Sequence, residues 1–143
     1  MSSPPPPGLF RAFCQSLDIS LFFVPAKHLY SIHCMDDQSC GRVGGEPRGG
    51  STKRMNNYPA HKEYQGATAN PEDPRYIKKV CAGPMVEEDD KYMVGSFFLV
   101  EATREEAQKF VDNDPFNKES VWQTISVQRY VSVVGVKAHD GNL

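Results

Sequence analysis

Four segments of the chain have the apolar and polar patterning of β-strands. The first and the last alternate apolar and polar side chains with the two-residue period of a strand, and the third is rich in aromatic and branched residues. Gly83-Pro84 stops the second segment, in which Cys81 is expected to be buried. In the last segment, alternate residues starting from Val121 lie on one face of the strand, and those starting from Trp122 lie on the other. The predicted strands are residues 29–35 (LYSIHCM), 75–82 (RYIKKVCA), 94–101 (VGSFFLVE) and 121–131 (VWQTISVQRYV).

The first helical signal lies between the first two strands. Residues 58–68 (YPAHKEYQGAT) carry Pro59 where the first turn of a helix tolerates it, and Gly66 lies near the end. Residues 36–57, which come before, are dense in glycine, charge and hydroxyl groups, and this composition is typical of a surface loop. The pattern therefore predicts a short helix that follows a long Gly-rich loop.

A capping box marks the second helix. Thr103 can accept a hydrogen bond from the amide of Glu106, whose own side chain can reach back to the amide of Thr103. Pro115 prevents the helix from continuing past Asp114. The apolar residues that share one face of this helix are Ala107, Phe110 and Val111.

The elements follow in the order strand, helix, strand, strand, helix, strand. This order predicts the ferredoxin-like βαββαβ motif of the α+β class, an antiparallel sheet with both helices on one face. The other face also needs a cover, and a second copy of the chain is the economical one in a protein this short. We therefore expect a homodimer of the dimeric α+β barrel type.

The same pattern divides the chain into a domain and two flanking segments. Residues 28–134 carry the predicted α+β domain, and residues 135–143 form a C-terminal tail. Residues 1–27 open with four prolines and continue as an apolar, nearly uncharged extension. Within it, residues 9–24 form a rough helical stripe suited to lie on a partner protein. A cleaved targeting peptide is the alternative interpretation of this extension.

Composition and charge narrow the function classes. At 143 residues the chain has the size of one domain, and 39% hydrophobic with 24% charged residues is typical of a soluble globular protein. The formal net charge of -2 gives no electrostatic reason to expect nucleic acid or an anionic membrane as partner. No apolar run reaches the ~20 residues that span a bilayer. We expect no nucleic acid and no membrane span.

Candidate ligand sites in the first half lack the spacing that metals and phosphates require. His33, Cys34 and Cys40 offer three ligands, but the sequence has no CxxC pair and no fourth ligand at the spacing of a zinc site. The glycine pairs of GRVGGEPRGGS are not followed by the GKS or GKT of a phosphate-binding loop. The sequence therefore predicts neither a metal nor a cofactor.

Several motifs, in this order, resemble the YciI-like (YCII-related) family of dimeric α+β barrel proteins. They are the AGP of residues 82–84, an acidic turn, the GSFFLVEA of residues 95–102, a helix, and the DPF of residues 114–116. The resemblance runs from about Leu29 to Val131. Residues 58–64 (YPAHKEY) resemble the first-helix motif of the family, in which His61 matches the histidine, and Asp114 matches the aspartate of the DP motif.

The resemblance implies that His61 and Asp114 approach each other in a cleft between helix and sheet. A carboxylate beside an imidazole fixes its tautomer and leaves a base or acid usable near neutral pH. By analogy with relatives of this fold, we expect proton abstraction without a cofactor, with Ser96 and Tyr64 as candidate hydrogen-bond donors to the substrate. The simpler alternatives are that Asp114 only ends a helix and bonds a turn amide, and that His61 is a surface residue.

Two function classes therefore remain open. In the first, the chain is a non-catalytic accessory subunit whose residues 9–24 and Gly-rich loop dock onto other proteins, in the mitochondrion or the cytoplasm. In the second, it is a small lyase or isomerase that uses His61 and Asp114 for proton transfer on a small organic substrate. The Gly-rich loop replaces the short link that the family resemblance implies between the first strand and the first helix. The sequence favours the first class, because docking explains both this loop and the N-terminal extension, and chemistry explains neither.

Overall fold

The computed structural model describes residues 24–37, 52–88 and 92–135. Most of the predicted N-terminal extension, the middle of the Gly-rich loop and nearly all of the C-terminal tail lie outside the described residues. The docking roles predicted for the extension and the loop therefore concern segments that lie mostly outside the described residues. Within the described ranges, no helix combines the length and the apolar character needed to cross a membrane.

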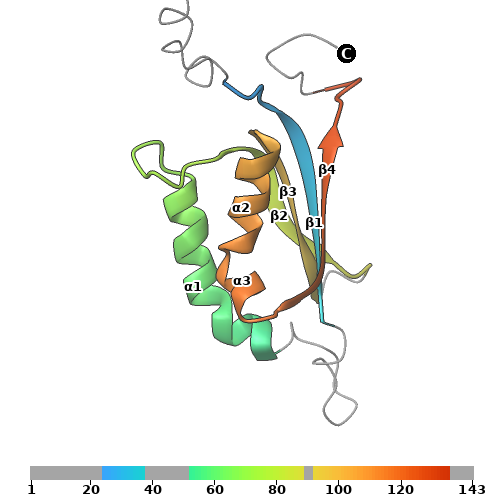
Figure 1. Ribbon diagram of the computed structural model, residues 1–143. Coiled ribbons are helices and arrows are strands. Elements are labelled where there is room, and N and C mark those ends of the chain that lie inside the picture. Colours follow the sequence, from blue (N-terminus) through green and yellow to red (C-terminus); the bar gives the residue numbers. More distant parts are fainter. Residues whose placement is uncertain (1–23, 38–51, 89–91, 136–143) are drawn as a thin grey trace, which may run out of the picture.

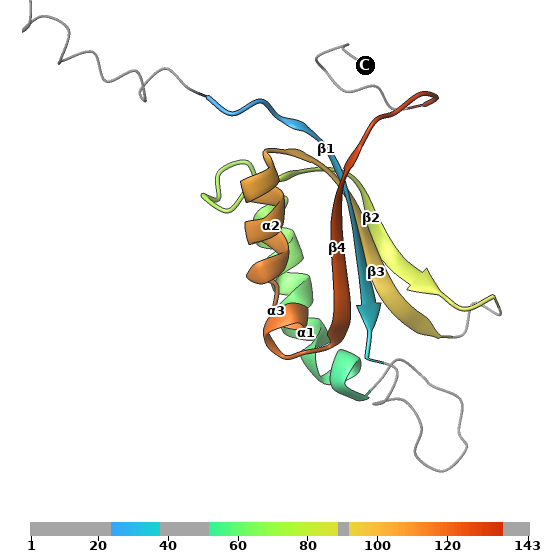
Figure 2. The ribbon, with the colours of Figure 1, turned by 45° about the vertical axis from the view of Figure 1, so that its right-hand side comes forward.

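Four antiparallel strands form one sheet in the order β2-β3-β1-β4. Three helices pack on one face of this sheet, so that the domain has two layers (Figures 1 and 2). This arrangement confirms the predicted ferredoxin-like α+β fold. The strands are β1 (His28–Asp36), β2 (Lys78–Val86), β3 (Met93–Ala102) and β4 (Trp122–Tyr130), and the helices are α1 (Thr52–Thr68), α2 (Arg104–Asp112) and α3 (Pro115–Lys118).

The hydrophobic core lies between the helices and the two central strands. Ile32 on β1 pairs with Phe98 on β3, and Tyr30 pairs with Val100, so that alternate residues of both strands point to the helices. Val111 of α2 is fully buried in the same cluster. Burial of each large apolar side chain contributes roughly 1.5–3 kcal/mol relative to exposure, which makes this layer the main source of stability.

No described helix covers the opposite face of the sheet (Figure 2). His33 and Phe97 are cross-strand neighbours on this face, with ring centroids 4.9 Å apart. The exposed His33 and the half-buried Phe97 give the face a mixed polar and apolar character. The homodimer expected from the sequence would cover this face, and that oligomeric state stays a prediction.

The capping box of α2 is present as predicted. The hydroxyl of Thr103 accepts from the amide of Glu106 at 3.1 Å, and the Glu106 carboxylate accepts from the amide of Thr103 at 2.8 Å. Reciprocal capping satisfies two of the backbone donors that the first turn leaves without partners. The box therefore fixes where the chain turns from β3 into α2.

The first helix is longer than predicted. It begins at Thr52 and not at residue 58, so Pro59 lies inside the helix and the preceding loop is shorter. The polar run TKRMNN hid this start, because its composition continues that of the Gly-rich loop. Proline removes one helical hydrogen bond and bends the axis, and the first turns of α1 tilt away from the rest (Figure 2). This extra length brings Arg54 into the core, where it is 3% exposed.

The second strand also departs from its prediction. It continues through Gly83 and Pro84 to Val86, because β2 is an edge strand, on which proline need not donate a ladder hydrogen bond. Cys81 is exposed and not buried. In the last strand, Trp122 is 4% exposed and packs in the core. An irregular register opposite Asp36 breaks the strict alternation that placed Trp122 and the core residue Val127 on opposite faces.

Gly95 in β3 has no room for a side chain. A Cβ atom there would collide with the carbonyl oxygen of Cys34 and would lie 2.7 Å from Cε of Met85. We expect Gly95→Ala to lower the free energy of unfolding by roughly 2–3 kcal/mol, because backbone must move to relieve the overlap. Gly83→Ala is the matched control, since a Cβ there meets nothing within 4 Å. Urea unfolding measures both variants, and equal losses would contradict the predicted clash.

Candidate functional site

His61 and Asp114, the pair expected from the motifs, are in contact. His61 lies on α1 and Asp114 is the N-cap of α3, and Nδ1 of His61 is 2.8 Å from Oδ1 of Asp114. The Asp114 side chain is 0% exposed and that of His61 is 11% exposed. When Nδ1 donates to the carboxylate, Nε2 of the neutral imidazole is left as the acceptor.

The Asp114 carboxylate holds three donors at once. Besides His61, Oδ1 accepts from the backbone amide of Phe116 at 2.8 Å, and Oδ2 accepts from Nε2 of Gln65 at 2.8 Å. The hydrogen bond from the Phe116 amide caps α3, while the other two hydrogen bonds join Asp114 to side chains of α1. The bond to a turn amide and the pairing with His61, considered as alternatives from the sequence, are therefore combined in one side chain, whereas α2 ends before it, at Asp112.

Aromatic side chains hold the imidazole in place. The His61 ring stacks on the Phe116 ring, with centroids 3.8 Å apart and planes 3° from parallel. Trp122 meets the His61 ring edge-on, with centroids 6.0 Å apart. Because the ring is packed from two directions, it has little freedom to rotate away from Asp114.

A pocket of about 340 Å³ lies between α1 and the half of the sheet formed by β2 and β3. Both His61 and Ser96 line it, so Nε2 of His61 is the ring nitrogen left for a molecule in the pocket. The volume lies in the range of small-molecule sites. The charged, polar and aromatic residues that line it include Arg54, His61, Lys62, Lys79, Ser96 and Phe98.

Arg54 and Asp36 form a buried ion pair beside this pocket. Nη1 of Arg54 donates to both carboxylate oxygens of Asp36, at 2.8 and 2.9 Å, and Nη2 donates to Oγ of Ser96 at 3.2 Å. Burial raises the pKa of the Asp36 carboxyl, and the Arg54 guanidinium acts in the opposite direction. Because the Ser96 oxygen accepts from Arg54, its own O–H is left to donate elsewhere, and its role as a hydrogen-bond donor to a substrate stays a prediction.

Tyr64, the other predicted substrate donor, is placed differently. Its hydroxyl donates to the carbonyl oxygen of Phe110 at 2.8 Å, and burial raises the pKa of Tyr64 to about 12. The side chain lines a separate pocket of about 280 Å³ and not the one that contains His61. A substrate contact of Tyr64 would therefore require a ligand in that second pocket.

Lys79 on β2 directs its ammonium group at the end of α1. Nζ donates to the carbonyl oxygen of Gln65 at 2.9 Å and to Oγ1 of Thr68 at 2.8 Å, and it lies 5.3 Å from the ring centre of Phe110. Burial lowers the pKa of Lys79 to about 8, while the charge of Asp114 acts in the opposite direction. A half-buried cation therefore lies close to the His61–Asp114 pair.

Lys79 is expected to make the protein more stable as the pH rises from about 8 to about 10. Its pKa falls from 10.5 to about 8 on folding, so the folded state binds fewer protons than the unfolded state in this window. Tyr64 and Cys34, whose pKa values burial raises, act in the opposite direction. Comparing thermal unfolding of the wild type and Lys79→Met at both pH values isolates the lysine. Identical pH responses of the two proteins would contradict the expectation.

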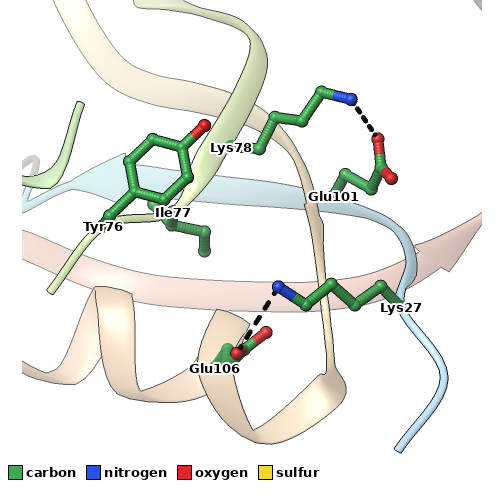
Figure 3. Close-up of a pocket in the computed structure, with 6 residues that line it drawn as sticks. All are labelled: Lys27, Tyr76, Ile77, Lys78, Glu101 and Glu106. Atoms are coloured by element: carbon green, nitrogen blue, oxygen red, sulfur yellow. Dashed lines mark hydrogen bonds and ion pairs between the residues drawn. The ribbon is translucent and has the colours of Figure 1, made fainter. Parts of the chain in front are cut away.

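A smaller pocket of about 140 Å³ lies at the other end of β2 and β3 (Figure 3). Two ion pairs line it: Lys78 with Glu101 at 2.7 Å, and Lys27 with Glu106 at 3.9 Å. It contains none of the predicted site residues. Surface ion pairs of this kind contribute little to stability or binding.

Metal ligation has no geometric basis in the described part of the chain, where no three His, Cys, Asp or Glu side chains lie close enough to hold an ion. Cys34 is buried and Cys81 is exposed. Cys40, which was considered with His33 and Cys34 as a third ligand, lies outside the described residues.

Sequence reasoning missed several residues of the site. Gln65 had a usable signal, because it lies four positions after His61 and therefore on the same helical face. Arg54 had none, since it was assigned to the loop. Lys79 was predicted to lie in a strand, but strand patterning does not identify which helix end a side chain meets.

Comparison with solved structures identifies a similar enzyme. The structure of 5-chloro-2-hydroxyhydroquinone dehydrochlorinase (TftG) from Burkholderia phenoliruptrix AC1100, in complex with 2,5-dihydroxybenzoquinone, matches with a TM-score of 0.52 and 30% sequence identity. The match covers 71% of this chain and 92% of that chain. A comparison with curated proteins gave no match.

The YCII-related domain matches residues 29–130, which run from the second residue of β1 to the last residue of β4. Of the elements that the structure describes, the matched range includes β2, β3, β4, the three helices and all of β1 except its first residue, and it contains both His61 and Asp114. The chain therefore belongs to the family of YCII-related domain proteins.

Proposed function

We propose that the chain transfers protons on a small hydroxylated ring substrate, with His61 as the base and Asp114 as the group that orients it. The observation that carries the proposal is the 2.8 Å contact between Nδ1 of His61 and Oδ1 of Asp114 beside a pocket that His61 lines. A carboxylate that holds one ring nitrogen leaves the other free to exchange a proton with a bound molecule, as general acid–base catalysis requires.

The proposed reaction begins when a ring hydroxyl lies beside Nε2 of His61. Nε2 takes the hydroxyl proton, the O–H electron pair forms a carbonyl bond, and a ring π-pair shifts to a neighbouring carbon. That carbon then receives the proton from the imidazolium, which completes a tautomerisation and restores neutral His61. Asp114 stabilises the imidazolium while it exists, and the Ser96 hydroxyl is the candidate donor to the developing carbonyl oxygen.

The same base, His61, also promotes elimination when the carbon that received the proton carries a leaving group. A second hydroxyl loses its proton to Nε2, and its electron pair forms a second carbonyl bond. The displaced electrons move through the ring, and the leaving group departs with its bonding pair. The products are a quinone, the leaving anion and one proton, so the net change is loss of an acid HX and no oxidant is required.

The similarity to TftG supports this class of substrate. That protein is named as a dehydrochlorinase of a chlorinated hydroxyhydroquinone, and its structure holds 2,5-dihydroxybenzoquinone. A pocket of about 340 Å³ accepts one substituted ring of that size. We therefore extend to this chain the general class, a small ring that carries hydroxyl groups.

The subunit interpretation, which the sequence favoured, has less to support it. Most of the segments that motivated it lie outside the described residues, so it gains no contact from the structure. The pocket beside His61, in contrast, has the features of a small-molecule site. We therefore place catalysis first and treat the non-catalytic subunit as the outcome that a negative assay would favour.

The proposal is tested by chloride release from 5-chloro-2-hydroxyhydroquinone in the presence of the full-length chain. A chloride electrode follows elimination, and NMR in deuterated buffer follows exchange at the ring carbons, which reports tautomerisation alone. We expect the protein to accelerate at least one of the two processes above the buffer rate. Failure in both assays would overturn the proposed function.

A further inference from the structure

Among the described residues, the pocket beside His61 is lined by cations and by no acidic side chain. Arg54, Lys62 and Lys79 line it, and no described aspartate or glutamate does. The guanidinium of Arg54 already binds the Asp36 carboxylate in a buried pair. Lys62 is exposed to solvent, where its charge is screened. Lys79 is the remaining cation, and it is partly buried.

Lys79 differs from the two lysines that line the smaller pocket. In Figure 3, Lys27 and Lys78 each meet a glutamate. The hydrogen bonds of the Lys79 ammonium within the described residues go to uncharged oxygens, those of Gln65 and Thr68. An ammonium group has three donors, so two such bonds leave one donor for a further acceptor.

Lys79 is also connected to the His61–Asp114 pair. The residue whose carbonyl oxygen accepts from Lys79 is Gln65, and the side chain of Gln65 donates to Asp114. His61 and Lys79 line the same pocket from opposite walls, α1 and β2. A ring that places a hydroxyl at His61 therefore lies in the same cavity that Lys79 lines, with Phe98 as an apolar surface.

From this arrangement we infer that Lys79 binds an anionic oxygen of the ligand, so that the pocket selects small rings that carry a carboxylate or an ionised hydroxyl group. The inference rests on the proposed function for its identification of the ligand as a substrate. Charge-assisted hydrogen bonds to a partly buried ammonium are about twice as strong as neutral ones. Desolvation, which lowers the pKa of Lys79, is offset when an anion supplies the missing counter-charge.

A purely structural role for Lys79 is the alternative. Cations near a helix C-terminus hydrogen-bond the last carbonyl groups, and Gln65 and Thr68 lie in the last turn of α1. That role requires donors at this position but no ligand. The two roles are separated by Lys79→Gln, whose amide can still donate to the helix end but carries no charge.

The test compares two probes of nearly the same shape, the anion 2,5-dihydroxybenzoate and its neutral amide 2,5-dihydroxybenzamide. Isothermal titration with the full-length chain at pH 7 should show the benzoate binding about 10-fold or more tightly. In Lys79→Gln and Lys79→Met this preference should disappear, while affinity for the amide changes by less than about 3-fold. Lys62→Met is the matched control and should keep the preference, because Lys62 lines the same pocket but is exposed.

Three results would overturn the inference: equal affinity of the wild type for the two probes, a preference that persists in Lys79→Gln, or no binding of either probe at about 10 mM. The binding assay is independent of turnover. A preference that depends on Lys79, without chloride release or ring exchange, would sustain the anion site and reject the proposed function. If turnover is the same in Lys79→Gln as in the wild type and both probes bind with equal affinity, the proposed function is sustained and the anion site is rejected.

Discussion

Replacing His61 with alanine is expected to reduce kcat by about 10²–10⁴-fold, the usual contribution of a positioned general base. The side chain supplies Nε2, which we have assigned as the proton acceptor, and no described neighbour offers an equivalent nitrogen at that place. KM should change less than kcat, because the cationic and apolar walls that bind the ring remain. Chloride release or ring exchange measures the effect, according to which of the two the wild type accelerates.

The control for His61→Ala is His33→Ala, which removes an exposed histidine from the helix-free face of the sheet. That variant should retain wild-type activity. Asp114→Asn adds a test of orientation, since an amide keeps an acceptor oxygen for the α3 cap but no longer presents a carboxylate to the imidazole. It should lower kcat while the protein stays folded. Activity of His61→Ala within about 3-fold of the wild type would show that another group is the base.

The sequence contained enough information for the order of the four strands and of α1 and α2, but not for the short helix α3. The capping box at Thr103 fixes the start of α2 through local hydrogen bonds, so short-range patterning found it. The pairing of His61 with Asp114 is different in kind. The two residues are 53 positions apart, and no local periodicity brings them together. Only the resemblance of the motifs to a family predicted that contact.

Other features escaped prediction because they depend on tertiary context. Cys81 has the neighbours of a buried strand, yet it is exposed because β2 is at the sheet edge. Trp122 joined the core through an irregular register that alternation does not encode. The start of α1 was hidden by its polar composition, because its stability comes from packing, including that of Arg54, and not from an apolar stripe.

Removing Arg54 is expected to have the largest effect on stability. Its guanidinium donates two bonds to Asp36 and one to Ser96, all three side chains being nearly inaccessible to water. Breaking a buried ion pair from one side costs roughly 3–5 kcal/mol, because the remaining charge stays in a poorly solvated place. For a chain of this size Arg54→Met should lower the melting temperature on the order of 10 °C.

Two controls test whether the expected loss of stability comes from the burial of the ion pair. Arg75→Met removes an exposed arginine that also contacts an aspartate at 2.8 Å, Asp73, and should leave the melting temperature nearly unchanged. The double variant Arg54→Met with Asp36→Leu should recover much of the lost stability, since apolar replacement of both partners leaves no buried charge.

The pH dependence of Arg54→Met provides the sharpest check. Burial already raises the pKa of Asp36 above its usual value, and loss of the guanidinium removes the main influence that lowers it. In the variant, the folded state should therefore bind a proton at Asp36 at a higher pH than the unfolded chain does. Stability relative to wild type should then improve as the pH falls from about 7 towards about 5. A deficit that stays constant over this range, or a double variant no more stable than Arg54→Met, would mean that lost packing and not the buried charge causes the destabilisation.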